Sequence, residues 1–295
     1  MLFSFNNKQI KGLLLTTVGV LFVIPDSLLI RLISADILTT TFWRCFFSGV
    51  IISIVVLLFY LKQAKDFIKN PGINGIIFII CHGLGSIFFI AAIEMTSVAS
   101  ALFILSTSPV FAAIISRIFL KETISLRIFL TIIGALFGIA IISIGSSNHS
   151  EFSMLGNIAA LLCAITLAIH LTIARSTPNF SMVPATAFSA FFTCLCISFF
   201  ISPFSLSPSD WIYLLILGII FVPIATILIV TGPRYISAAE VSLLVLLEAI
   251  LAPILVWYVL GENPGILTLI GGGIVISVLI TSNVIAIKSS ISIMK

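Results

Sequence analysis

Charged residues are scarce in this sequence of 295 residues. Asp, Glu, Lys and Arg make up 8% of the chain, whereas hydrophobic residues make up 60% and the mean hydropathy is +1.33. Soluble domains carry roughly 25% charged residues because their surfaces must be solvated. The composition therefore excludes a soluble domain of this size and indicates a protein embedded in a lipid bilayer.

Several motifs that would indicate a particular chemistry are absent as well. There is no GxxxxGK[ST] nucleotide-binding loop and no GxSxG or HExxH motif, so ATP-driven activity would need a partner and hydrolysis is not expected. The net charge of +4 comes without a basic patch interleaved with aromatic residues, which argues against nucleic acid as a partner. No cofactor is expected. The cysteines lie inside apolar blocks without CxxC spacing, which predicts small buried side chains rather than a disulfide framework or metal site: Cys45, Cys81, Cys163, Cys194 and Cys196.

The sequence does contain a series of apolar blocks of about 20 residues, the length that a helix needs to cross a bilayer. Turn or charge signals separate most of them. Strands are excluded because open sheet edges cannot face lipid. Ten transmembrane helices are predicted near 12–33, 38–61, 73–95, 97–119, 126–146, 154–175, 182–202, 210–232, 236–260 and 264–286.

The positive charges predict the orientation of these helices. If the N-terminus is cytoplasmic, all of the 14 Lys and Arg residues except Arg31 and Arg44, hence 12, fall on inner segments. Because Lys and Arg are enriched in cytoplasmic loops, this bias supports both the number and the direction of the helices. We expect an all-α integral membrane protein with both termini in the cytoplasm. The outer loops carry acidic residues instead: Asp36, Glu151, Asp210 and Glu262.

An internal repeat relates the two halves of the chain. Residues 97–102 and 237–242 each open an apolar block after a very short link, at an offset of 140 positions (237 minus 97). The same offset aligns Glu122 with Glu262, and a glycine-rich block follows each of them. Repeats of this kind indicate two copies of one structural unit.

We divide the chain into a first five-helix repeat, 1–148, and a second five-helix repeat, 149–295. Five crossings are an odd number, so the second copy enters the membrane from the opposite side and the repeats are inverted. Inverted repeats underlie alternating access, with a substrate site near the midplane between the halves.

These features resemble the drug/metabolite transporter superfamily, EamA type. The resemblance is carried by the Trp43-Arg44 pair early in the second block, by Glu122 and Glu262 closing the fourth and ninth blocks, and by the segment 91–122. It covers nearly the whole chain. It implies a multi-pass carrier of metabolites or amino acids in a bacterial inner membrane, often an exporter, but a family fold does not name the substrate.

Ionisable groups inside the membrane cost roughly 2.5 to 3.5 kcal/mol on insertion scales, so each suggests a function. Asp26 follows Pro25, whose kink would leave carbonyls free to line a cavity beside a carboxylate. The alternative is a structural kink with Asp26 reaching the outer interface. Glu248 is the deepest carboxylate. It could exchange a proton or hold a cationic substrate group, or it could be a neutral acid hydrogen-bonded to a neighbouring helix.

Two further polar residues lie within the blocks. His82 is flanked by Gly83 and Gly85, small residues that would let another helix or a substrate approach closely. A hydrogen-bonded packing histidine is the alternative. Arg44 could attract a carboxylate or phosphate, although the family resemblance favours a structural pair with Asp26 or Asp36.

Other residues give weaker signals. Trp257 fits an aromatic belt at the membrane interface or could face a cavity. Glu94, Glu240, His170 and Arg175 are expected near helix ends, where solvation explains them. Glu122 and Glu262 are expected to cap neighbouring helices. The candidates for helix kinks or gating are Pro25, Pro109, Pro223 and Pro253.

The leading hypothesis is a secondary transporter of small molecules that works by alternating access, with coupling to protons as one option beside uniport and exchange. An amino acid, a small amine or an amphipathic metabolite would fit the Phe-rich sequence. A nucleotide-sugar or sugar-phosphate carrier is the first alternative, although only Arg44 lies well inside a span. A membrane receptor would need larger loops. An intramembrane enzyme could use Ser86 beside His82, or His170 beside Ser176, without motif support.

Overall fold

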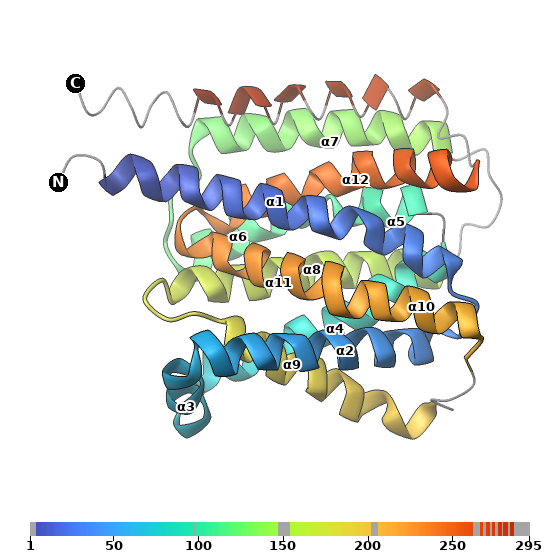
Figure 1. The fold of residues 1–295 in the computed structure, drawn as a ribbon. Helices are drawn as coiled ribbons and strands as arrows, with labels where there is room; N and C mark the ends of the chain where they lie inside the picture. The colour runs from blue at the N-terminus through green and yellow to red at the C-terminus, as the bar shows by residue number, and fades with distance from the viewer. Residues whose placement is uncertain are drawn as a thin grey trace.

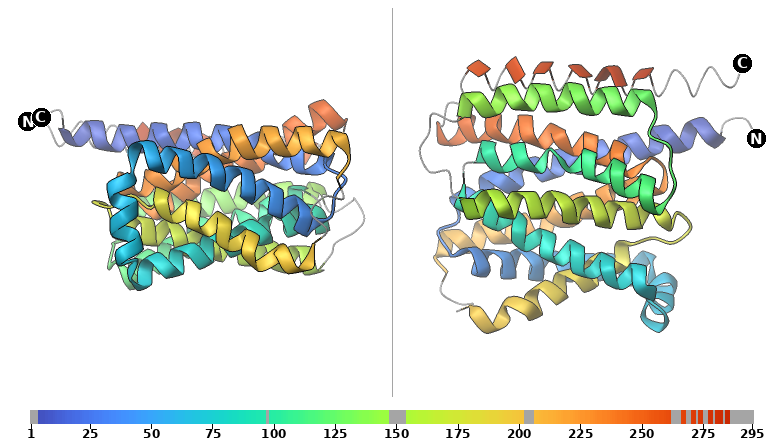
Figure 2. Two further views of the ribbon diagram at one scale, coloured as in Figure 1. Left: turned by 60° about the horizontal axis from the view of Figure 1, so that its bottom comes forward. Right: turned by 180° about the vertical axis from the view of Figure 1, so that it is seen from behind.

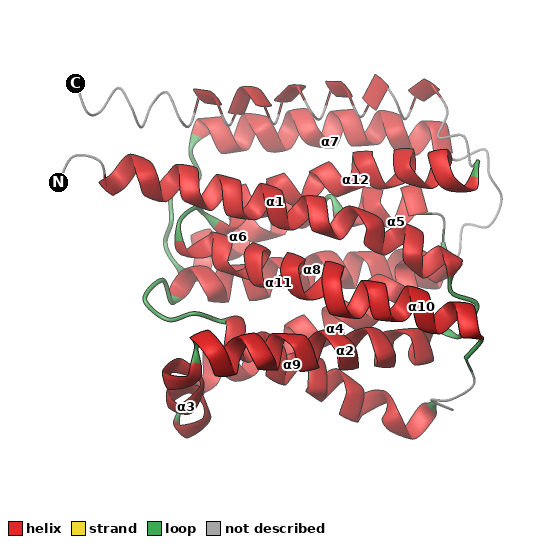
Figure 3. Cartoon of the chain, viewed as in Figure 1, coloured by secondary structure: helices red, strands yellow, loops and turns green. Residues whose placement is uncertain are grey.

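The computed structural model describes residues 4–96, 98–146, 154–201 and 206–261, together with short stretches between 266 and 285. Every regular element among these residues is a helix, as Figure 3 shows. The elements of the first half are α1 (Ser4–Leu32), α2 (Ile37–Phe59), α3 (Leu61–Lys69), α4 (Gly72–Met95), α5 (Val98–Leu105), α6 (Ser108–Phe119) and α7 (Leu126–Ser146).

The second half repeats this order with shorter pieces at its third crossing. Its elements are α8 (Met154–Ser176), α9 (Val183–Ile197), η1 (Ser198–Phe200), α10 (Pro208–Ile216), η2 (Leu217–Phe221), α11 (Val222–Thr231), η3 (Gly232–Arg234) and α12 (Ala238–Leu260).

Seven stretches of the described chain are long and apolar enough to cross a membrane. They are Lys8–Leu32, Ile37–Phe59, Gly72–Met95, Met154–Ser176, Val183–Phe200, Pro208–Arg234 and Ala238–Leu260. Two shorter apolar helices are Ser108–Phe119 and Leu126–Gly138. The tenth predicted block, 264–286, lies partly outside the described residues. Glu262 lies outside them as well. The count of ten helices therefore stays a prediction.

The outside of the bundle is apolar. Leu58, Phe59, Phe119, Phe137 and Tyr258 are all strongly exposed on it. Exposed apolar surface on this scale is not stable in water and fits a lipid environment. The long helices lie side by side along one direction, and α3 lies across one end of the bundle (Figure 1, Figure 2).

The fourth predicted helix is broken rather than continuous. It forms α5 and α6, which are separated by a turn at Ser106 and Thr107. Pro109 is the second residue of α6 and has no N–H to continue the hydrogen-bond ladder. The sequence predicted one helix here because the apolar residues on both sides of the turn add up to a block long enough to cross a bilayer. The helix α3 was likewise not predicted, since its nine residues are too short and too polar to stand out.

The other candidate kink prolines differ in their setting. Pro223 follows the π-helical turn η2, where the Val222 amide donates to the Leu217 carbonyl five residues back. Local π turns of this kind accommodate the missing proline donor. Pro25 and Pro253 lie inside the continuous helices α1 and α12.

Helix packing between the halves is reciprocal. The helix α1 packs against α11 and α12, and its counterpart α8 packs against α4, α5 and α6. The helix α2 packs against α9, the corresponding second helix of the other half, and α6 packs against α12. These contacts of α1 and α2 with the second half are thus matched by equivalent contacts of α8 and α9 with the first half.

Two glycines, one in α1 and one in α8, make equivalent close contacts with neighbouring segments. A Cβ placed on Gly12 would lie 2.7 Å from Cβ of Tyr235, just before α12. One placed on Gly156 would lie 2.9 Å from the carbonyl carbon of Met95, just before α5. Only glycine allows backbones to approach this closely.

Arginines in the last turns of these two helices also match. Arg31 of α1 donates from Nη2 to the carbonyl of Thr96 at 3.0 Å. Arg175 of α8 donates from Nη1 to the carbonyl of Pro233 at 3.3 Å. Thr96 lies in the short link before α5, and Pro233 lies in the short link before α12. Each arginine therefore joins the end of its helix to the equivalent link in its own half.

Candidate functional site

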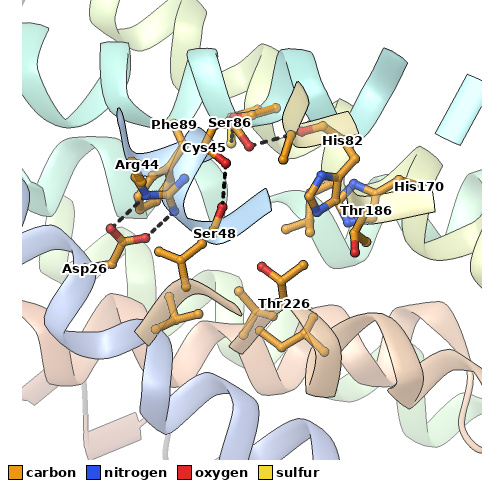
Figure 4. A pocket seen from close by; sticks show the side chains of 18 of the residues that line it. Asp26, Arg44, Cys45, Ser48, His82, Ser86, Phe89, His170, Thr186 and Thr226 are labelled. Atoms are coloured by element: carbon orange, nitrogen blue, oxygen red, sulfur yellow. Dashed lines mark hydrogen bonds and ion pairs between the residues drawn. The ribbon is translucent and has the colours of Figure 1, made fainter. Parts of the chain in front are cut away.

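A cavity of about 150 Å³ lies in the middle of the bundle (Figure 4). Four helices from each half line it, namely α1, α2, α4 and α5 together with α8, α9, α11 and α12. Its polar lining residues are Asp26, Arg44, Cys45, Ser48, His82, Ser86, Cys163, His170, Thr186, Thr226 and Glu248. The predicted residues Asp26, Arg44, His82 and Glu248 are therefore brought together in one place.

The strongest contact in the cavity joins Arg44 of α2 to Asp26 of α1. Nε of Arg44 donates to Oδ1 of Asp26 at 3.1 Å, and Nη2 donates to Oδ2. The guanidinium also lies over the ring of Phe89, 5.8 Å from its centroid. A two-point contact of this kind fixes both side chains, and truncating either partner would leave a buried charge. Asp36, the other partner considered for Arg44, instead caps the start of α2.

Glu248 lies in the same region without a partner of comparable strength. Its side chain is buried, with the residue 3% exposed. It accepts a hydrogen bond from Ser27 Oγ at 3.5 Å, which is at the long limit for such a bond. It lies within electrostatic range of Asp26 and Arg44, but forms no salt bridge within the described chain.

Two histidines from different halves meet at the other side of the cavity. The rings of His82 in α4 and His170 in α8 have centroids 5.0 Å apart. Ser189 lies 2.7 Å from Nδ1 of His82 and donates its own hydrogen to the Thr186 carbonyl at 2.9 Å. A hydroxyl has one hydrogen, so when Ser189 donates to Thr186 its oxygen accepts from Nδ1 of His82, and in that neutral tautomer Nε2 is an acceptor.

The glycines beside His82 are close-approach positions, as expected. A Cβ on Gly83 would lie 2.8 Å from Oγ1 of Thr193 in α9, and one on Gly85 would lie 3.0 Å from Oγ1 of Thr166 in α8. The helix α4 is therefore held tightly between α8 and α9, which fixes the direction in which His82 enters the cavity.

Other residues that the sequence analysis singled out do not take the roles considered for them. Trp257 is 41% exposed and is not among the residues that line the cavity. Ser86 donates to the backbone carbonyl of His82 at 3.3 Å rather than to its imidazole. Ser176 likewise donates to a backbone carbonyl, that of Ile173.

The structure corrects the expectations about Glu240, Glu122 and Arg175 at helix ends. Glu240 is buried in the capping box of α12, where it accepts hydrogen bonds from Ser237 and pairs with Arg127. Glu122 pairs with Arg175 at 2.8 Å. These groups were expected to be solvated or to act as caps, but each ion pair instead joins one half of the chain to the other.

A polar cavity enclosed by two structurally matched halves of an apolar bundle is typical of membrane carriers. The chain belongs to the EamA-like transporter family, whose pattern it matches twice, over residues 10–144 and 154–284. It is a multi-pass membrane protein.

Individual proteins are also similar to this chain. The uncharacterized transporter YdfC of Bacillus subtilis (strain 168) is 26% identical over 185 residues, which are 61% of this chain and 60% of that relative's length. A protein of known crystal structure has the same fold with a TM-score of 0.75 at 18% identity, covering 96% of this chain and 99% of the other. At that identity the likeness shows the fold alone.

Among the cavity residues that were not predicted for the site is His170, which was expected near a solvated helix end but is buried and lines the cavity. A signal for it exists in the repeat. The two family matches begin at residues 10 and 154, an offset of 144 (154 minus 10). At this offset Asp26 falls on His170, and Arg31 falls on Arg175. The predicted site residue Asp26 in the first half therefore indicates His170 as the equivalent position in the second half.

Proposed function

We propose that this protein is a secondary transporter that moves small metabolites or amino acids, by efflux or exchange, through alternating access. The observation that carries the proposal is the central polar cavity bounded by four helices from each half. A site on the boundary between two similar halves can be exposed to either side when one half rocks against the other.

We further propose ten helices with both termini in the cytoplasm, as the positive charges predict, and the reciprocal packing supports the inverted relation between the two halves. Arg31 and Arg175 make matching contacts near the ends of α1 and α8. If α1 and α8 begin on opposite sides of the membrane, these contacts lie at opposite ends of the bundle. Each contact lies within one half, so a rocking half would carry its own contact with it as part of a rigid unit. The boundary between the repeats is proposed at residues 148 and 149.

The dimensions and chemistry of the cavity favour a small substrate. The volume of about 150 Å³ is smaller than that of pockets for drug-sized ligands, which measure about 300–1,000 Å³. The guanidinium of Arg44 is already committed to Asp26, so it is not free to hold a phosphate. These observations favour a metabolite or amino acid over a nucleotide sugar or sugar phosphate.

A proteoliposome flux assay tests the transport proposal. Labelled amino acids, amines, organic acids and sugars would be tested for uptake and efflux, with and without a pH gradient. We expect selective flux for one class, reduced at least tenfold in Glu248→Gln. Glu94→Gln is the matched control because that carboxylate lies on α4 and does not line the cavity. Absence of flux for every class, from protein shown to be folded and inserted, would contradict the proposal.

A further inference from the structure

The charges in the cavity do not balance. Its lining contains two carboxyl groups, Asp26 and Glu248, but only one residue with a permanent positive charge, Arg44. The other titratable groups that line it are the thiols of Cys45 and Cys163 and the imidazoles of His82 and His170. If both carboxyl groups are ionised, one further positive charge is required.

Arg44 cannot serve both carboxylates in this structure. Its Nε and Nη2 atoms both donate to Asp26, and its guanidinium lies over Phe89. Glu248 is left with the 3.5 Å hydrogen bond from Ser27. An ionised carboxylate without a partner is strongly unfavourable away from water. Glu248 must therefore hold either a proton or a cation that enters the cavity from outside.

The histidines are poorly placed to supply the missing charge. Figure 4 shows His82 and His170 on the opposite side of the cavity from the pair formed by Asp26 and Arg44. Glu248 lies within electrostatic range of that ion pair. The imidazoles are also only 5.0 Å apart, so charging both would create a direct repulsion.

We infer that the substrate of this transporter is a small monovalent organic ammonium ion, and that it exchanges with a single proton on Glu248. The inference rests on the proposed transport function and specifies its substrate class. Aliphatic side chains from α1, α8 and α12, namely Val23, Leu167 and Val245, would contact the organic part, and the cavity volume of about 150 Å³ excludes large polycations.

The exchange is balanced in atoms and charge. On one side of the membrane the neutral carboxyl of Glu248 loses its proton to water as the ammonium ion binds to the resulting carboxylate. On the other side a proton from water returns to the carboxylate and the ammonium ion leaves. One positive charge is exchanged for one, so transport is electroneutral. A pH gradient would drive it, and a membrane potential alone would not.

The decisive experiment measures proton release from the purified protein in weakly buffered detergent solution containing a pH indicator. Tetramethylammonium chloride is the probe, because it carries a permanent charge and has no proton of its own to release. Sodium chloride controls for ionic strength, and tert-butanol is the uncharged analogue of similar shape. The titration is repeated over a series of pH values.

We expect saturable release approaching one proton per chain with tetramethylammonium, and none above background with sodium chloride or tert-butanol. Release should vanish in Glu248→Gln and persist in Glu94→Gln. Glu248→Asp keeps a titratable carboxyl and should retain release at a shifted pH, which separates loss of the group from loss of the fold.

Absence of proton release at every pH in folded protein would overturn the inference. So would Glu248-dependent flux in proteoliposomes that is limited to neutral or anionic solutes, although the transport proposal would then stand. Flux of ammonium ions that responds to membrane potential without a pH gradient would likewise contradict electroneutral exchange. Failure of all solutes to move would remove the transport proposal and this inference with it.

Discussion

The guanidinium of Arg44 holds both carboxylate oxygens of Asp26 in a buried, membrane-embedded setting. A pair of this kind gains little over an apolar replacement, because both charges must be removed from water. Removing one partner is different, since the remaining charge then has no counter-charge. The pair is thus best explained as a device that positions α1 against α2 and occupies the only arginine in the cavity lining.

Stability measurements on single and double variants test this account of the pair. Arg44→Gln should destabilise the protein by about 3–5 kcal/mol because Asp26 is left buried and unpaired. The double variant Asp26→Asn, Arg44→Gln should recover part of that loss, since both groups become neutral and can still hydrogen-bond. Thermal unfolding in detergent compares the variants.

Arg44→Lys serves as the charge control, because lysine keeps the charge but lacks the planar fork that contacts both oxygens. The stability of Arg44→Lys should lie between the stabilities of the wild type and Arg44→Gln. Equal stability of the single Arg44→Gln variant and the double variant would show that Asp26 does not depend on Arg44.

Charge made some of the cavity residues predictable. Asp26, Arg44 and Glu248 were identified because ionisable groups are costly within an apolar block. His170 was not, because a histidine close to Arg175 resembles the polar end of a helix. Its burial depends on the contacts that α8 makes with α4, and the sequence of α8 alone does not contain that information.

Helix boundaries could be predicted from the sequence where a polar capping residue stands at the start of the helix. Asp36 is the N-cap of α2, and its carboxylate accepts hydrogen bonds from the amides of Leu38 and Thr39. The break between α5 and α6 also falls on polar residues, Ser106 to Ser108 before Pro109, but this short signal stands inside a longer apolar block and was predicted only as a kink candidate at Pro109. The helix α3 depends on burial of Ala64 and Phe67 against other segments, which is again information from packing.

The cap at Asp36 gives a testable prediction for α2. Asp36→Ala should lower the stability of the protein by about 1 kcal/mol, whereas Asp36→Asn should lower it much less, because asparagine is an equally good N-cap. Unfolding in detergent at neutral pH measures the difference. Equal losses in the two variants would contradict a capping role.

The loss of stability caused by Asp36→Ala should also depend on pH. Partial burial acts to raise the pKa of Asp36, but hydrogen bonds from Thr39 and Leu38 outweigh it and hold the pKa below the ordinary value of 3.8. A lowered pKa means that the ionised cap stabilises the fold above that ordinary value, and that this contribution is lost as the pH falls through the lowered pKa. The stability gap between the wild type and Asp36→Ala should therefore narrow in acid.

For the molecule as a whole, the two halves are joined by ion pairs as well as by apolar packing. Glu122 pairs with Arg175, and Arg127 pairs with Glu240, so each pair links one repeat to the other. The repeat itself was predictable from the 140-residue offset. The partners of these charges were not, because they depend on how the two repeats are placed against each other.

Breaking one of these links should shift the balance between the states of an alternating-access carrier. A partly exposed ion pair contributes up to about 1 kcal/mol, which corresponds to a change in population of up to about fivefold. We therefore expect Glu122→Gln to raise the rate at which a small methanethiosulfonate reagent labels Cys45, which lines the cavity.

Asp66→Asn is the control, because Asp66 is an exposed carboxylate on α3 that forms no salt bridge within the described chain. It should leave the labelling rate unchanged. An unchanged rate in Glu122→Gln as well would indicate that this ion pair persists in both states.

The central claim is that the cavity between the halves is where the transported molecule binds. The most direct measurement is substrate protection of the cysteines, followed by mass spectrometry, with the solute that shows flux in proteoliposomes. Cys45 and Cys163 line the cavity, whereas Cys81 and Cys196 do not. The account predicts that the solute slows labelling of Cys45 and Cys163 and leaves Cys81 and Cys196 unaffected. Equal protection of all four cysteines, or of none, by a solute that is transported would contradict it.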